Sequence, residues 1–157
     1  SIKVIRSKRE QPAPTNLAAM ADREVGFMEI ALPNLRGETV KLSDVAEGKP
    51  TLINFTAYAL EWSPALNMTL GELYATYHGK GLEIYQVSLD EDLHFWKNAA
   101  SNLPWICVRD PQSVYSSVAA LYYVRQLPAL FLLDKKGNLV KRIEDLKNLE
   151  ADVKSVL

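Results

Sequence analysis

Two predicted strands separated by one amphipathic helix set the strongest limit on what this chain can fold into. Residues 51–56 form a continuous, mostly apolar run, which is typical of a strand covered on both faces of a sheet, and residues 82–89 are predicted to be the next strand. The segment 64–77 between them is predicted to be a helix, because its large apolar residues recur at helical spacing: Leu66, Leu70, Leu73, Tyr74 and Tyr77. A strand, a helix and a strand in this order predict a βαβ unit with parallel strands.

The rest of the chain continues the alternation of strands and helices. Turn-rich stretches at 33–37 and 134–137 predict two β-hairpins. Strands are expected at residues 27–32, 39–42, 106–109, 129–133 and 138–143, and helices at 92–100, 113–123 and 144–157. This order predicts an α/β fold in which a central mixed β-sheet is flanked by helices and preceded by an N-terminal β-hairpin.

Length and charge restrict the class of protein. The 157 residues suit one domain with a sizeable core, and no apolar stretch approaches the length of a membrane span. The net charge of −1 provides no field that would attract nucleic acid, so we expect no nucleic-acid partner. No cofactor motif is present, and one cysteine with two separated histidines matches no metal-ligand spacing, so neither a cofactor nor a metal is expected.

The first residues differ in composition from the rest. Five charges fall within residues 1–10, and two prolines and a run of small residues follow. We interpret residues 1–24 as a linker from an upstream region, with a short helix possible at 16–23, and residues 25–157 as the folded domain. The chain begins at Ser1 without a signal-peptide pattern, so we expect a piece of a longer protein.

Three segments carry a family resemblance: GKPTLINF, LYATYHGKGLEIYQVSLDED and QLPALFLLDKKGNLV. Together with the Leu127–Pro128 bond directly before the strand at 129–133, they resemble the thioredoxin-like superfamily, in particular its TlpA/ResA-like and AhpC/TSA branch. The resemblance covers roughly residues 25–157. It implies a thioredoxin-like fold, thiol–disulfide oxidoreductase chemistry and a cis peptide bond at Pro128.

The redox motif of that family is degenerate here. In that family the first long strand is followed by the motif Cys-x-x-Cys, and the equivalent residues of this chain are Leu60-Glu61-Trp62-Ser63. The register of the peroxiredoxin branch places the reactive cysteine on Ala59 instead. Neither Leu60 nor Ser63 can supply the thiolate that attacks a disulfide, and Ser63 has no evident base to activate it. We therefore expect no catalytic residue, and we expect Ser63 to cap the helix, with Pro64 at its first position.

Two alternatives remain open for the single cysteine. Cys107 lies in the apolar run Trp105-Ile106-Cys107-Val108, where a lone cysteine is usually a small buried hydrophobic residue. The alternative is a one-cysteine redox device, which requires that this thiol be exposed and acidic.

A binding groove is the family feature that remains. The resemblance implies that Leu127, the residue before Pro128, pairs its backbone with an extended peptide. Tyr58 and Trp62 lie in the loop that carries the degenerate motif, where they either form an exposed binding patch or fold back over apolar surface. The acidic run 90–92 is expected to cap the following helix. Asn54 stands where many thioredoxins have a buried carboxylate.

Two functions follow as hypotheses. The first is a non-redox binding or scaffold domain of a larger envelope-associated protein, which holds a peptide or the upstream neighbouring domain. The second, by analogy of fold, is a thiol–disulfide oxidoreductase of TlpA/ResA type in cell redox homeostasis. The resemblance alone implies a location outside the cytoplasm, either periplasmic or membrane-anchored.

Overall fold

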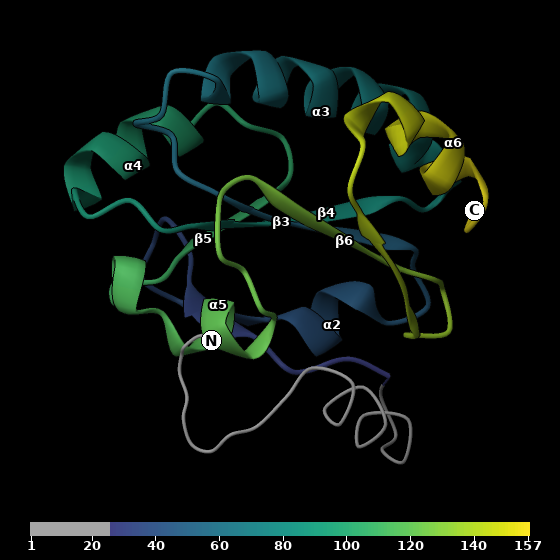
Figure 1. Cartoon of the computed structure of the whole chain (residues 1–157), viewed down its shortest axis with the longest axis horizontal. Helices are drawn as coiled ribbons and strands as arrows, with labels where there is room; N and C mark the ends of the chain where they lie inside the picture. The colour runs from purple at the N-terminus through teal and green to yellow at the C-terminus, as the bar shows by residue number, and fades with distance from the viewer. Residues whose placement is uncertain (1–25) are drawn as a thin grey trace.

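The computed structural model describes residues 26–157, so the predicted linker and the helix at 16–23 lie outside the described residues. Its centre is a five-stranded sheet of order β5-β4-β3-β6-β7 (Figure 1). The strands are β3 (Thr51–Thr56), β4 (Glu83–Ser88), β5 (Ile106–Arg109), β6 (Ala129–Leu133) and β7 (Leu139–Ile143). β3, β4 and β5 are parallel, whereas β6 and β7 are antiparallel to their neighbours, which confirms the predicted mixed sheet.

Helices cover both faces of the sheet (Figure 1). One face packs against α3 (Ser63–Tyr77), α4 (Leu93–Ala100) and α6 (Leu149–Lys154). The other face packs against α2 (Leu42–Ala46), α5 (Ser117–Leu121) and the hairpin of β1 (Ala31–Pro33) and β2 (Thr39–Lys41). All six residues of β3 are buried, as its mostly apolar run predicted, and all six residues of β4 are buried as well.

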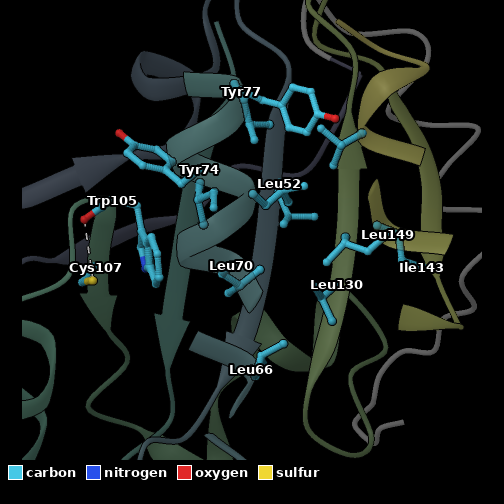
Figure 2. Packing of buried hydrophobic residues seen from close by; sticks show 14 of the residues in the cluster. Leu52, Leu66, Leu70, Tyr74, Tyr77, Trp105, Cys107, Leu130, Ile143 and Leu149 are labelled. Atoms are coloured by element: carbon cyan, nitrogen blue, oxygen red, sulfur yellow. Dashed lines mark hydrogen bonds between the residues drawn. The ribbon is translucent and has the colours of Figure 1, made fainter. Parts of the chain in front are cut away.

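The apolar stripe of α3 anchors this helix to the sheet. Figure 2 shows Leu66, Leu70 and Tyr77 of α3 on the side of Leu52 of β3 and Leu130 of β6, whereas Tyr74 of α3 points toward Trp105. Full burial of one such side chain contributes about 1.5–3 kcal/mol to stability. The three-residue 3₁₀ helix His78–Lys80 follows α3, and Gly81 ends it at φ 107°, as the glycine pattern predicted.

The N-terminal hairpin is shorter than expected and forms a sheet of its own. Residues 27–30 are not a strand, although Phe27 and Ile30 are core residues. Gly26 forms backbone hydrogen bonds with Gly137 and Leu139 beside β7, and residues 27–30 lead from there to β1. Leu42, predicted to end the second strand, begins α2.

Two helices predicted as continuous are interrupted. Residues 113–123 contain the 3₁₀ helix Ser113–Tyr115 and then α5, because Ser116 is extended (φ −57°, ψ 119°) and its hydroxyl caps α5 by accepting from Ala119 N–H. Residues 144–157 contain the 3₁₀ helix Leu146–Asn148 and then α6. Asp145 initiates that 3₁₀ helix by accepting from Lys147 N–H, so the helical segment begins later than predicted.

Candidate functional site

The candidate site lies at one edge of the sheet. Parallel strands β3, β4 and β5 end there, and they lead into the loops 57–62, 89–92 and 110–116. Because β6 is antiparallel to β3, with Phe55 opposite Ala129, the chain before β6 starts at the same edge. Leu127–Pro128 is a cis peptide bond, and both residues are half-buried. The structure thus brings the degenerate motif and Leu127–Pro128 to one edge, as the family resemblance implies.

The motif positions keep a thioredoxin-like arrangement without thiols. Leu60 is 41% exposed, whereas Ser63 is 2% exposed at the first residue of α3. The backbone N–H of Ser63 donates to the carbonyl oxygen of Leu60 at 3.0 Å, which closes a tight turn between the two positions. A leucine and a serine in this turn cannot form or open a disulfide bond.

The prediction that Ser63 caps α3 is wrong. Ser63 is the first helical residue, the residue before it is Trp62 in a helical conformation, and no side chain caps this end. Loop 57–62 already winds as turns, because Leu60 N–H donates to Ala57 and Ser63 N–H donates to Leu60. The turns carry the backbone directly into the helix, so Ser63 has no extended position from which to cap. Pro64 was predicted at the first helical position and is the second residue of α3, within its first turn.

Asp90 fixes the loop that carries the motif, a role that its sequence position did not reveal. This buried carboxylate accepts hydrogen bonds from the backbone N–H groups of Tyr58 (2.8 Å) and Ala59 (3.0 Å) and from the Ser88 hydroxyl. Within the acidic run 90–92, Asp92 does cap α4, by accepting from Phe95 N–H at 3.0 Å. Asp90 instead ties the end of β4 to the end of β3, so the loop is held in place.

Tyr58 points into the protein, which corrects its assignment to an exposed binding patch. Its side chain is buried, and its hydroxyl donates to Oε1 of Gln86. Burial raises the pKa of Tyr58 well above its usual range, so the phenol stays protonated. The second of the two alternatives therefore applies: Tyr58 folds back over the interior. Trp62 is half-buried and packs at the margin of the core that α3 covers.

Gln86 is the centre of a buried polar network that sequence analysis missed. Its Oε1 accepts from Trp105 Nε1 at 2.9 Å as well as from Tyr58. Its Nε2 donates to Oδ1 of Asn54 and to Oδ1 of Asn67, each at 2.9 Å. The available signal was a pair of amides, Asn54 and Gln86, in neighbouring apolar strands. Every hydrogen-bonding atom of the Gln86 amide thus has a partner, as a buried amide requires.

Cys107 is buried beside this network, which confirms the expectation for a lone cysteine in an apolar run. It is 6% exposed on β5, and its Sγ lies 3.6 Å from the Tyr58 hydroxyl oxygen. Burial raises the pKa of Cys107 to about 11, so almost no thiolate exists at neutral pH. These properties are opposite to those that a one-cysteine redox device requires.

Thiol titration of the native protein should therefore be slow. The thiolate fraction at pH 7 is roughly 300-fold lower for a pKa of 11 than for an ordinary cysteine, and burial slows access further. We expect dithionitrobenzoate to label native protein at least about 100-fold more slowly than a small thiol, with a rate that rises with pH. In denaturant, the one thiol should react at once. Equal rates in native and denatured protein would contradict this placement of Cys107.

Two further findings concern residues 26–157. No cluster of three or more His, Cys, Asp and Glu side chains in this range has the arrangement of a metal site. No helix in the same range is both long enough and apolar enough to cross a membrane.

Comparison with known proteins places the chain in a family. The model of the AhpC/TSA family matches residues 26–142. Nucleoredoxin of Xenopus laevis is 29% identical over 117 residues, which are 69% of this chain but only 28% of that protein. The thiol-disulfide oxidoreductase ResA of Bacillus cereus is 29% identical over 130 residues, which are 78% of this chain and 73% of ResA.

Solved structures agree with this assignment. The solution structure of an uncharacterized thioredoxin-like protein from Bacteroides vulgatus is 47% identical and superposes with a TM-score of 0.75. The match covers 81% of this chain and 83% of that one. The strand order and the cis Leu127–Pro128 bond described above agree with the same fold. The chain therefore belongs to the AhpC/TSA family, in its thioredoxin-like, TlpA/ResA-like branch, and contains one cysteine.

Proposed function

We propose that this domain binds an extended polypeptide segment at the Leu127–Pro128 edge and does not catalyse dithiol–disulfide exchange. The observation that carries the proposal is the pair Leu60 and Ser63, which occupies an intact, hydrogen-bonded turn without a thiol. Exchange needs an attacking thiolate and a second thiol that resolves the mixed disulfide. The one thiol of the chain is buried on β5 and has a raised pKa.

The binding part of the proposal is supported by the geometry of the edge. Leu127 precedes β6 beside the end of β3, at the position whose backbone pairs with an extended peptide in this family. Trp62 is half-buried at the same edge and offers aromatic surface that a bound segment can cover. Asp90 holds the intervening loop, so the edge is formed before a ligand arrives. The bound segment that we propose is an extended peptide.

The second candidate is a thiol–disulfide oxidoreductase, which is favoured by the name of the relative ResA. For this chain, that activity requires thiols supplied by another protein, because the turn at 60–63 holds none. A one-cysteine device through Cys107 is opposed by its burial. A location outside the cytoplasm, periplasmic or membrane-anchored, is a proposal that rests on the family resemblance.

A nuclear magnetic resonance titration tests the binding function. The ¹⁵N-labelled protein is titrated with the uncharged extended peptide acetyl-Gly-Val-Thr-Val-Ser-amide. We expect saturable shifts of the Leu127 amide and the Trp62 indole, and Trp62→Ala should weaken binding at least about fivefold. Met68→Ala is the matched control, because Met68 is 68% exposed on α3 and lies outside the loops of the edge. Shifts confined to other surfaces, or equal affinities for both variants, would contradict the proposal.

A further inference from the structure

Two adjacent apolar side chains project from the candidate edge. Val114 is 76% exposed and Tyr115 is 86% exposed, which makes them more exposed than the other large apolar side chains of the described residues. They lie in the 3₁₀ turn Ser113–Tyr115 that follows β5. Single exposed apolar residues are common on protein surfaces and need no explanation. An adjacent pair that includes a tyrosine, a residue type enriched at binding hot spots, favours an interaction role.

The turn that carries this pair is held firmly. The buried Asp110 carboxylate accepts from the Gln112 N–H at 2.8 Å and from the Ser116 hydroxyl. Ser113 adopts φ 52°, a left-handed conformation that is uncommon for a residue other than glycine. Its hydroxyl donates to the carbonyl oxygen of Leu89 at 2.6 Å. The backbone below Val114 and Tyr115 is therefore ordered before any partner binds, which lowers the entropy cost of binding.

The turn belongs to the same edge as Leu127. The Ser113–Leu89 bond joins it to the loop after β4, and Asp90 joins that loop to residues 58 and 59 after β3. In Figure 1 the ends of β3 and β5 and the start of β6 lie at the same end of the sheet. Three strand spacings separate β5 from β6, which is about 14 Å. An extended peptide of about five residues spans that distance.

Exposed charges along this edge are mainly negative. Glu61 follows β3, and Glu91 and Asp92 follow β4, all with exposed side chains. Arg109 brings one positive charge to this edge, where its guanidinium donates to the carbonyl oxygens of Asp90 and Glu91, each at 2.9 Å. Arg125 is the exposed cation that precedes β6. The edge therefore combines apolar anchors with an excess of carboxylates, which is complementary to a cationic and apolar segment.

We propose that the segment bound at this edge is an extended polypeptide with alternating apolar and cationic side chains. Its apolar side chains pack on Val114 and Tyr115, and its Lys or Arg side chains face Glu61, Glu91 and Asp92. This proposal rests on the binding function proposed above and adds the class of ligand and the turn that selects it. It predicts that both charge and the Tyr115 side chain determine affinity.

Two fluorescein-labelled peptides test the proposal by fluorescence anisotropy: one with four Leu-Lys repeats and one with four Leu-Glu repeats. We expect the lysine peptide to bind at least about tenfold more tightly than the glutamate peptide, and added salt to weaken its binding. Tyr115→Ser and Glu91→Gln should each weaken its binding, Tyr115→Ser at least about fivefold. Met68→Ser and Glu47→Gln are the matched controls, since Met68 lies on α3 and Glu47 precedes the opposite end of β3.

The outcomes separate the two proposals. Equal affinity for both peptides, or an unchanged affinity in Tyr115→Ser, overturns the ligand class. If, in that case, the Leu127 amide still shifts on titration with the uncharged peptide, the proposed binding function is supported and only the proposed ligand class is wrong. If neither labelled peptide binds and the Leu127 amide does not shift, the binding function fails and the ligand class fails with it. An equal loss of lysine-peptide affinity in Glu47→Gln and Glu91→Gln overturns the role of the edge carboxylates.

Discussion

The double variant Leu60→Cys/Ser63→Cys is expected to accelerate the reduction of insulin by dithiothreitol, an activity that we do not expect of the natural chain. The turn at 60–63 is closed by a backbone hydrogen bond of 3.0 Å, and such a turn keeps its end Cα atoms within about 7 Å, close to the range of a disulfide. Leu60 is exposed in the turn that leads into α3, close to the helix N-terminus, which lowers the pKa of a nearby thiol. Position 63 is buried, as suits a resolving thiol.

The expected gain is at least about tenfold over dithiothreitol alone, because both the attacking and the resolving thiol are then present. Each single variant is a control that supplies one of the two thiols and should turn over little insulin. Circular dichroism confirms that the variants are folded, and thiol counting reports the new disulfide. A folded double variant that forms its disulfide but stays inactive would show that more than the thiols is missing from the site.

Gln86→Leu is expected to lower the free energy of unfolding by about 3–5 kcal/mol. The substitution keeps a similar volume but removes every hydrogen bond of the amide. The indole N–H of Trp105 loses its acceptor in the interior, and Asn54 loses the donor to its Oδ1. A buried donor or acceptor without a partner costs about 1–3 kcal/mol. Urea unfolding followed by tryptophan fluorescence measures the change.

Gln126→Leu is the matched control for Gln86→Leu. Gln126 is exposed directly before Leu127, so the same substitution should change the free energy of unfolding by less than about 0.5 kcal/mol. A loss below about 1 kcal/mol in Gln86→Leu would mean that the network of Tyr58, Gln86 and Trp105 contributes little to stability. Gln126→Leu also reports whether a change at the edge itself disturbs the fold.

The sequence predicted the fold where the pattern of apolar residues is local. The runs at 51–56 and 82–89 became the fully buried β3 and β4, and the helix predicted at 64–77 became α3, which begins one residue earlier. The spacing of apolar residues along these segments indicates which side chains face the core. Burial of the apolar surface of these side chains is the dominant driving force for folding. The break at Ser116 was missed because it depends on its hydrogen bond with Asp110, not on helical spacing.

The candidate site could be predicted only in part. The positions of Leu60, Ser63 and Leu127–Pro128 followed from the family resemblance, and the structure places them at one edge. The inward orientation of Tyr58 and the roles of Asp90 and Gln86 did not follow. Their hydrogen bonds join residues about 30 positions apart, such as Ala59 with Asp90 and Asn54 with Gln86. Such residues become neighbours only because two strands pair in the sheet. The propensity of each residue for a helix or a strand contains no information on which strands pair.

We propose that this thioredoxin-fold chain does not carry out thiol–disulfide exchange. The most direct test of this proposal is the rate of insulin precipitation in dithiothreitol with and without the natural chain, with Cys107→Ser measured in parallel. We predict that the rates with the natural chain and with Cys107→Ser both equal the rate with dithiothreitol alone, because the edge holds no thiol and Cys107 is buried. A clear acceleration by the natural chain that is lost in Cys107→Ser would contradict this proposal.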